Sequence, residues 1–268
     1  MFAIATTPSP RRAYDALAPH YEDFTSGQDY ARWIAALLEL ARRHGVAGRR
    51  LLDGGCGTGK SFAGLPADGW AVTACDASPG MLARARERHG HAARLHLADL
   101  RDLPAYGPHD LAWALCDVAN YQLTERDLTA VLAGLRRNLV PGGVALFDCS
   151  TVKAYRDFFG ATIAQEIANR LLVWHGRADG VGFAPGDHAP AVMYAFVEER
   201  NGSWSRTVSR HLQRHHPRDV VERALRTAGL ALAAVYGQTA DLRFEPDVDE
   251  ERHDKAIYVA INDTREGR

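Results

Sequence analysis

The chain has 268 residues, of which 46% are hydrophobic and 24% charged, a balance typical of a folded globular protein. Its 32 Lys and Arg residues nearly equal its 33 Asp and Glu residues, which leaves no excess of positive charge for a nucleic-acid backbone. The sequence contains no apolar run of membrane-spanning length, and its first residues lack the apolar core of a signal peptide. We therefore expect a cytoplasmic protein without nucleic-acid or membrane partners.

The cysteines predict neither a disulfide framework nor a metal site. They are widely spaced and form no CxxC pair: Cys56, Cys75, Cys116 and Cys149. A free cysteine usually packs as a small apolar residue, so we expect free thiols close to the ends of predicted strands.

Between residues 50 and 150, short apolar runs alternate with amphipathic stretches, the pattern of a parallel sheet with crossover helices. We predict helices over 30–44, 79–88 and 125–139, the last with an N-cap at Thr124 and a stop at Pro141-Gly142-Gly143. The predicted strands of this part are 49–55, 70–76, 93–99, 109–116 and 144–149.

After residue 150 the pattern becomes antiparallel. Predicted strands at 170–178, 191–200 and 203–216 include a hairpin turn at Asn201-Gly202. A helix over 217–227 and strands at 230–237 and 255–261 would complete the main sheet. We therefore predict an α/β fold with a doubly wound, mostly parallel sheet and a small inserted antiparallel lid. Its expected segments are N-terminal cap helices (1–45), a ligand-binding core (46–150), the lid (151–216) and a C-terminal part (217–268).

The segment LLDGGCGTGKS (51–61) follows a predicted strand and is expected to open a helix, where backbone N–H groups can face a ligand. A dinucleotide fingerprint, GxGxxG, fits poorly because Lys60 occupies the place of the last glycine. The pattern GxxxxGK[ST] of a P-loop NTPase fits residues 54–61 in full, and VALFD (144–148) would supply an acidic residue for magnesium. Against this alternative, the Asp53 carboxylate would repel a triphosphate.

A third interpretation uses a larger set of residues. Asp53 and the GxGxG turn are followed by Asp76 at the end of the second strand and Asp99 at the end of the third. An acidic residue about twenty positions beyond such a loop can bind ribose hydroxyls, and the next one can meet an adenine amino group. Together they favour an adenosine that carries no phosphates.

These segments, LLDGGCGTG, VTACDASPGML and LHLADLRDLP, resemble the cofactor motifs of class I S-adenosylmethionine-dependent methyltransferases, which have a Rossmann-like fold. The resemblance implies S-adenosylmethionine as cofactor and S-adenosylhomocysteine as product. It assigns the glycines to the methionine moiety, Asp76 to the ribose, Met81 to the adenine face, and Asp99 with Leu100 to the adenine edge. The expected cofactor residues are Asp53, Gly55, Gly57, Gly59, Asp76, Met81, Asp99, Leu100 and Cys116. No metal is expected.

The methyl acceptor is expected beyond the fourth and fifth strands, at 116–123 and 148–151, where Asn120 and Tyr121 are candidates. The lead segment 13–27 carries Tyr14 and Tyr21 seven residues apart, two turns of a helix, so both rings would share one side. This segment and the lid resemble small-molecule N-methyltransferases of the amino-sugar and glycine or sarcosine types. The candidate catalytic residues are Tyr14, Tyr21, Asn120 and Tyr121.

The resemblance implies methylation of a small-molecule amine. The Ala- and Arg-rich composition is compatible with specialised metabolism, and a homodimer is retained as one option. O-methylation and a non-catalytic S-adenosylmethionine-binding protein stay open as alternatives. A base for a hydroxyl acceptor would come from the histidines that flank the expected site: His20, His188, His211, His215 and His216. Half of the lid aromatics should face the acceptor by strand alternation, among Phe158, Phe159, Trp174, Tyr194, Phe196 and Trp204.

Overall fold

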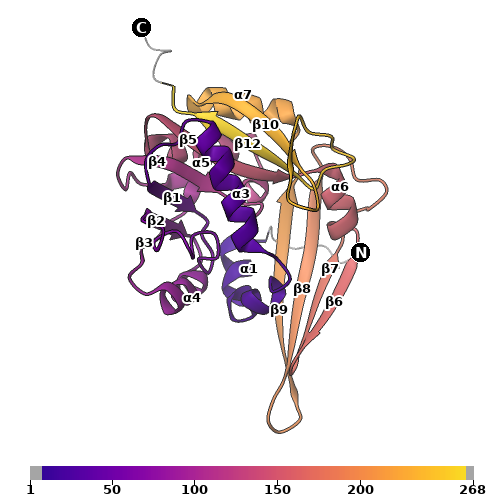
Figure 1. Cartoon of the computed structure of the whole chain (residues 1–268). Coiled ribbons are helices and arrows are strands. Elements are labelled where there is room, and N and C mark those ends of the chain that lie inside the picture. The colour runs from indigo at the N-terminus through magenta and orange to yellow at the C-terminus, as the bar shows by residue number, and fades with distance from the viewer. Residues whose placement is uncertain (1–7, 264–268) are drawn as a thin grey trace.

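The computed structural model describes residues 8–263, which form a main sheet with helices on both faces and a second, smaller sheet (Figure 1). The main sheet has eight strands in the order β11-β10-β12-β5-β4-β1-β2-β3. Strands β1 to β5 run parallel, whereas β12 is antiparallel to β5 and β10, and β11 is antiparallel to β10. The bounds are β1 Arg50–Gly54, β2 Ala71–Asp76, β3 Ala93–Leu97, β4 His109–Ala114, β5 Leu139–Ser150, β10 Ala231–Gln238, β11 Phe244–Pro246 and β12 Lys255–Ile261.

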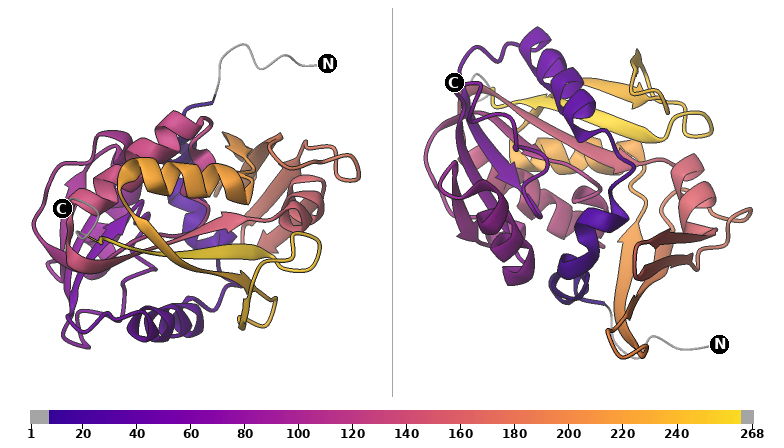
Figure 2. Two further views of the ribbon diagram at one scale, coloured as in Figure 1. Left: turned by 90° about the horizontal axis from the view of Figure 1, so that it is seen from above. Right: turned by 60° about the horizontal axis from the view of Figure 1, so that its bottom comes forward.

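Apolar helix faces cover both sides of this sheet. On one side, α5 (Glu125–Arg137) and α7 (Arg218–Ala228) share a buried cluster with residues of β4, β5 and β12. On the other side, α3 (Tyr30–Arg43) and Leu82 of α4 (Pro79–His89) join a second cluster. Figure 2 (left) shows the sheet between α7 and α3. The predicted doubly wound α/β class is confirmed.

The second sheet is a four-stranded antiparallel lid with the order β6-β7-β8-β9. Its strands are β6 Thr162–Ile167, β7 Arg170–Gly176, β8 His188–Glu198 and β9 Trp204–Arg214. The predicted hairpin turn is present, since Gly202 has φ 78° and the Asn201 side chain accepts a bond from Ser203 N. The lid extends away from the main sheet and ends in this hairpin (Figure 1).

Short helices connect the two sheets. The lead segment forms α1 (Pro10–Leu17), η1 (Ala18–His20) and α2 (Tyr21–Phe24), and α1 packs along β9. The predicted continuous helix that carries Tyr14 and Tyr21 is wrong, because Pro19 lies in a 3₁₀ turn between them. The remaining short elements are η2 Leu100–Asp102, η3 Ala119–Tyr121, α6 Val152–Ala154 and η4 Tyr155–Phe159.

The helix expected after the glycine loop is also absent. Residues 57–69 form successive turns in which Phe62 N bonds to Gly59 O and Leu65 N to Phe62 O. Pro66 has no N–H to donate to the Phe62 carbonyl, and Gly69 adopts φ 83°. The loop therefore has no helix N-terminus behind it, and any ligand there must be held by other groups.

Candidate functional site

A cavity of about 470 Å³ opens at the carboxyl ends of β1, β2 and β4, where the glycine loop leaves the sheet. We call it the glycine-loop cavity. It brings together six of the nine expected cofactor residues: Gly55, Gly57, Asp76, Asp99, Leu100 and Cys116. These positions span 62 residues of sequence, since the parallel strand order places successive strand ends at one edge.

Asp76 connects two parts of this cavity. Its carboxylate accepts hydrogen bonds of 2.8 Å from Gly57 N and of 2.8 Å from Ser78 N. Burial raises the pKa of Asp76, while these two N–H groups oppose the rise. A carboxylate offers about four acceptor positions, so two remain for the hydroxyls of a ribose.

Two glycines of the loop, Gly55 and Gly57, adopt backbone conformations that residues with a side chain rarely adopt. Gly55 has φ 77°, and a Cβ there would lie 2.6 Å from Val118 Cγ2. Gly57 has φ 55° with open space at its Cβ position, so a ligand can approach its backbone.

Asp99 and Leu100 form the outer wall of the glycine-loop cavity. The Asp99 carboxylate caps η2 through Arg101 N and pairs with the Arg101 guanidinium, which lowers the pKa of Asp99. Leu100 is buried beside it. An adenine amino group would share this carboxylate with Arg101.

Three expected cofactor residues do not line the glycine-loop cavity. Asp53 is buried behind the loop, where its carboxylate accepts a bond from Ser61 Oγ, and burial raises its pKa to about 7. Gly59 faces His89, and Met81 lies fully buried in a cluster with residues of the lead segment and the lid. The structure therefore does not bring Gly59 and Met81 to this cavity, whereas Asp53 lines a small neighbouring cavity of about 20 Å³ together with Gly55 and Gly57.

Lys60 does not support the NTPase alternative. Its ammonium donates to Thr25 O at 3.1 Å and Thr25 Oγ1 at 2.7 Å, and it lies 3.8 Å from a Glu22 oxygen. Lys60 thus fastens the loop to the lead segment. Neither the lysine nor a helix N-terminus is placed to hold phosphates.

A second cavity, of about 570 Å³, lies between the main sheet, the lead segment and the lid. We call it the lid cavity. Of the lid aromatics, Phe158, Phe159 and Trp174 line it, whereas Tyr194, Phe196 and Trp204 do not. The two cavities share four lining residues, Tyr14, Tyr21, Cys116 and Tyr121, which we call the junction.

The junction tyrosines approach one another despite the break in the lead helix. The ring centroids of Tyr14 and Tyr21 are 6.3 Å apart, and those of Tyr14 and Tyr121 are 5.5 Å apart. Tyr21 Oη lies 3.4 Å from the hydroxyl of Tyr30, which in turn lies 3.4 Å from Cys116 Sγ. Tyr30 was not a candidate in the sequence, which predicts only that it begins the helix over 30–44.

Backbone strain marks the same place. Cys116 and Asp117, two consecutive non-glycine residues that follow β4 after Leu115, have φ 61° and φ 65°. Such conformations persist only where the surroundings hold them, and here Asp117 N donates to Asp148 Oδ2 at 3.0 Å. The strain turns Asp117 toward the lid cavity, which it lines.

Asp117 belongs to a charge cluster with Lys255 and Asp148, of which Asp148 is fully buried and the other two are partly exposed. Lys255 Nζ pairs with Asp117 Oδ1 and with Asp148 Oδ2, and Ser150 Oγ donates to Asp117 Oδ1 at 2.8 Å. Burial alone would raise the pKa of Asp117, but the Lys255 charge brings it below its usual value. For Asp148 burial prevails and the pKa is raised. The cluster therefore presents an ionised carboxylate to the lid cavity, and Asp148 binds Lys255 where the NTPase alternative required magnesium.

Asn120 has a structural contact pattern. Its Nδ2 donates to Arg214 O and its Oδ1 accepts from Ser150 N, both at 2.9 Å. The side chain is fully buried and lines neither cavity. The structure therefore does not bring Asn120 to either cavity, since both ends of its amide join β9 to β5.

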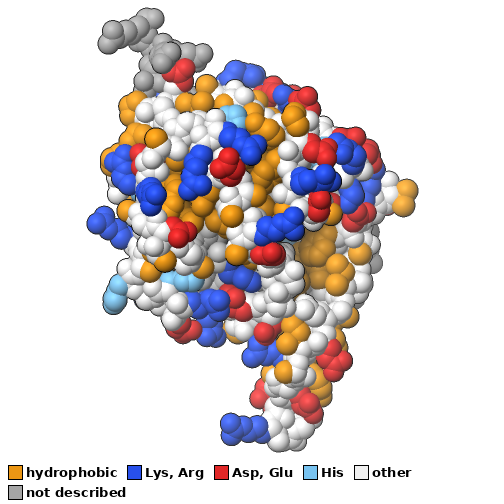
Figure 3. All heavy atoms as spheres, in the orientation of Figure 1, with side chains coloured by type: hydrophobic (Ala, Val, Ile, Leu, Met, Phe, Trp, Pro, Cys, Tyr) orange, Lys and Arg blue, Asp and Glu red, His pale blue; other side chains and the backbone are white. Residues whose placement is uncertain are grey.

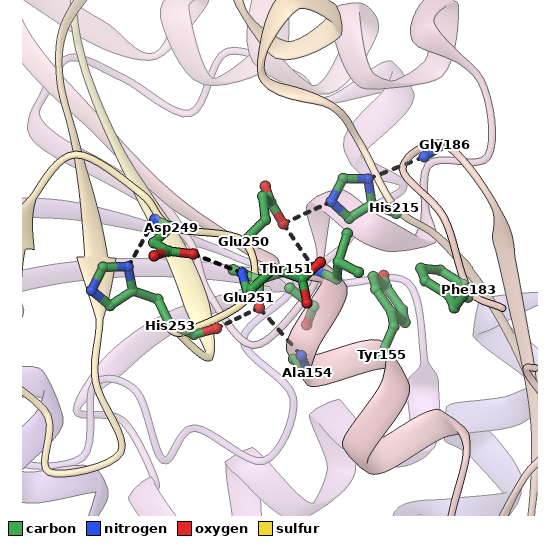
Figure 4. Close-up of polar contacts among 12 residues, drawn as sticks. Thr151, Ala154, Tyr155, Phe183, Gly186, His215, Asp249, Glu250, Glu251 and His253 are labelled. Carbon is green, nitrogen blue, oxygen red and sulfur yellow. Dashed lines mark hydrogen bonds and ion pairs between the residues drawn. The ribbon is translucent and has the colours of Figure 1, made fainter. Parts of the chain in front are cut away.

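Both chain crossings between core and lid are fastened to the loop before β12 (Figure 4). Glu250 accepts bonds from Val152 N at 2.8 Å and from His215 Nε2 at 3.1 Å. His215 Nδ1 accepts from Gly186 N at 3.1 Å, and Thr151 Oγ1 donates to His253 O at 2.6 Å. One loop thus fixes where the lid begins and where it ends.

Of the flanking histidines, His211 alone lines the lid cavity. His215 belongs to the lid fastening, His20 and His216 are buried elsewhere, and His188 is exposed at the start of β8. His211 Nδ1 lies 2.8 Å from Tyr121 Oη.

Residues 8–263 were also compared with what a metal ion, a membrane or a polyanion would require. Within this range no group of three or more His, Cys, Asp or Glu side chains is arranged to hold a metal ion. The same residues include no helix that is long and apolar enough to cross a membrane. All four cysteines are free thiols, as expected. On the face in Figure 3, basic and acidic side chains are interspersed, unlike the one-signed surface that a polyanion favours.

Comparisons with known proteins agree with this arrangement. Residues 51–143 match a family model described as a methyltransferase domain. The chain is 27% identical to the putative methyltransferase YqeM of Bacillus subtilis, over 89% of this chain and 94% of that protein. It is 32% identical to dTDP-4-amino-2,3,4,6-tetradeoxy-D-glucose N,N-dimethyltransferase of Saccharopolyspora spinosa, over 46% of this chain and 49% of that protein. Its fold matches a crystal structure of a S-adenosylmethionine-dependent methyltransferase from Clostridium acetobutylicum with a TM-score of 0.76, at 20% identity, over 93% of this chain and 99% of that chain.

Proposed function

We propose that this chain, a S-adenosylmethionine-dependent methyltransferase, methylates an amine nitrogen of a small molecule. The observation that carries the proposal is the junction, where Tyr14, Tyr21, Cys116 and Tyr121 line both the glycine-loop cavity and the lid cavity. A donor in the first cavity and an acceptor in the second would meet there. Holding two reactants in line is worth about 7–11 kcal/mol of the barrier.

The residues of the glycine-loop cavity fit the cofactor. When bound, S-adenosylmethionine supplies a methyl group already activated by its sulfonium charge. Asp76 would accept bonds from the ribose hydroxyls, Asp99 and Leu100 would hold the adenine edge, and Gly55 and Gly57 would let the backbone approach the amino-acid tail. At the junction the tyrosines position the acceptor nitrogen, and the lid excludes water from the cavity.

Nitrogen is favoured as the acceptor atom by the charge of the lid cavity. An amine enters as a cation at neutral pH, and Asp117 offers a partly buried, ionised carboxylate on the cavity wall. Aromatic rings such as Phe158 and Trp174 also favour a cation. The name of the Saccharopolyspora relative, an amino-sugar N,N-dimethyltransferase, supports the same class of acceptor.

The test is product formation with a panel of nucleotide-linked amino sugars and simpler amines, each paired with its hydroxyl analogue. We expect mass spectrometry to find one added methyl group on amines. Methylation of hydroxyl analogues alone would identify an O-methyltransferase. S-adenosylhomocysteine binding without any product from the panel would favour the non-catalytic alternative.

Asp117→Asn tests the acceptor charge. Loss of one charge-assisted bond, worth about 1.5–3 kcal/mol, should raise KM for the amine roughly ten- to 150-fold. Asp157→Asn is the control, since Asp157 is an exposed carboxylate outside the cavity. Unchanged S-adenosylhomocysteine affinity would show that Asp117→Asn is folded, and an unchanged KM would remove Asp117 from the acceptor site.

The remaining assignments rest on the sequence. We place the reaction in the cytoplasm and in specialised metabolism, without nucleic acid as a partner, and we retain the homodimer as an option. The division into cap (1–45), cofactor-binding core (46–150), lid (151–216) and C-terminal part (217–268) is proposed on the same basis.

A further inference from the structure

A chain of four hydrogen bonds runs from the junction into the lid. Tyr14 Oη and Tyr121 Oη are 3.2 Å apart, and Tyr121 Oη lies 2.8 Å from His211 Nδ1. His211 Nε2 lies 2.7 Å from Ser209 Oγ, which lies 2.7 Å from the carbonyl oxygen of Ala13. The chain thus starts on α1, passes through η3 and β9, and returns to α1.

The last link fixes the direction of the others. A carbonyl oxygen only accepts, so Ser209 uses its single proton on Ala13 O and must accept from His211 Nε2. His211 therefore carries its proton on Nε2 and a lone pair on Nδ1. Tyr121 must donate to that lone pair, which leaves its oxygen to accept from Tyr14.

The neighbourhood stabilises this neutral form of His211. The ring is almost fully buried, 5.5 Å from the Trp174 ring and 5.6 Å from the Tyr14 ring. Burial lowers the pKa of His211 to about 4. Its Nδ1 therefore stays an acceptor at neutral pH.

The hydroxyl protons of Tyr14 and Tyr121 are both donated within this chain of hydrogen bonds, to Tyr121 Oη and to His211 Nδ1. Among residues 8–263 no donor bonds to Tyr14 Oη, so its lone pairs remain available for the N–H groups of an acceptor. If either proton pointed into the junction instead, it would donate to the amine lone pair, which is the pair that must form the new bond to carbon.

We propose that His211 is a positioning residue which, by accepting a hydrogen bond from the Tyr121 hydroxyl, makes Tyr14 and Tyr121 present oxygen lone pairs instead of protons to the acceptor amine. This inference rests on the proposed function. It assigns His211 no proton transfer: the cationic amine would first lose one proton to solvent, and its freed lone pair would then form the N–C bond as the methyl–sulfur bond breaks, with S-adenosylhomocysteine as the leaving group.

The kinetic test is a double-mutant cycle with the amine identified by the panel. His211→Phe keeps an aromatic ring but removes the acceptor, and should lower kcat about three- to tenfold, the size of one neutral hydrogen bond. His211→Asn, whose Oδ1 can replace Nδ1, should restore part of that loss. In a Tyr121→Phe background, His211→Phe should have no further effect on kcat.

Within each background, His211→Phe should leave S-adenosylhomocysteine affinity unchanged, since His211 does not line the glycine-loop cavity. An equal loss of kcat from His211→Phe in both backgrounds, or no loss in either, would overturn the proposal. Nitrogen-15 NMR of labelled histidine gives a readout without turnover and should find His211 protonated on Nε2 alone; the opposite tautomer would also overturn it. A parent chain that forms no product would refute the proposed function, while the NMR result still decides the direction of the chain.

Discussion

Asp76 at the end of β2 accepts a 2.8 Å hydrogen bond from the backbone N–H of Gly57, so the carboxylate that faces the expected ribose also holds the glycine loop. Replacing Asp76 by Ala removes charge-assisted bonds of about 1.5–3 kcal/mol, and S-adenosylhomocysteine affinity should fall roughly ten- to 150-fold. Titration calorimetry measures this. Asp102→Ala, an exposed carboxylate outside the cavity, is the control, and equal affinities for both variants would exclude Asp76 from the site.

Lys60→Ala should separate the methyltransferase from the NTPase alternative. The Lys60 ammonium hydrogen-bonds to Thr25, and Lys60 does not line the glycine-loop cavity. The S-adenosylhomocysteine affinity of Lys60→Ala should therefore stay within about twofold of the parent value, less than the effect of one hydrogen bond. The parent chain should not bind ATP with magnesium. Magnesium-dependent ATP binding that Lys60→Ala abolishes would restore the P-loop interpretation.

The cofactor side of the site was largely predictable from sequence, for a physical reason. Parallel strands end at one edge, so residues at strand ends such as Asp76 and Asp99 converge whatever the lengths of the connections. Met81 and Gly59 could not be placed in this way. Their surroundings depend on the lead segment and on His89, which pack from elsewhere in the chain.

The residues proposed for the acceptor side are placed by tertiary contacts that leave no signal in the neighbouring sequence. Asp117 is turned by two left-handed residues and held by Lys255, which is 138 positions away. His211 is one of several histidines in the sequence, and only the docking of β9 against α1 selects it. Asn120 shows the reverse case: its amide hydrogen-bonds to the backbone of Arg214 and of Ser150, a pairing that the sequence does not reveal.

Tyr→Phe changes test whether the junction phenols position the acceptor. Removing the hydroxyl of Tyr14, Tyr21 or Tyr121 should lower turnover about ten- to a thousandfold while the fold persists. The rate should rise with pH as the substrate amine loses its proton, and its midpoint should follow the amine pKa across a substrate series. A profile that follows an enzyme group and disappears with one His→Ala change would indicate O-methylation with a histidine base.

The raised pKa of Asp53 predicts that the free energy of unfolding depends on pH. Burial raises its pKa to about 7, partly opposed by the bond from Ser61, whereas the unfolded chain has a value near 4. The folded state therefore binds this proton more tightly than the unfolded state. Its contribution to the free energy of unfolding is intact below about pH 4, decreases as pH rises toward 7, and is constant above that.

Asp53→Asn removes this titration and keeps an acceptor for Ser61. Relative to the parent, the variant should gain stability between pH 5 and pH 8, by at most about 4 kcal/mol for a shift of roughly three pKa units. Urea denaturation at several pH values measures the difference. Asp110→Asn is the matched control, because Arg50 lowers the pKa of Asp110 and its contribution should stay flat over this range. Parallel stability profiles for Asp53→Asn and the parent would mean that Asp53 is ionised throughout, with its charge balanced inside the loop.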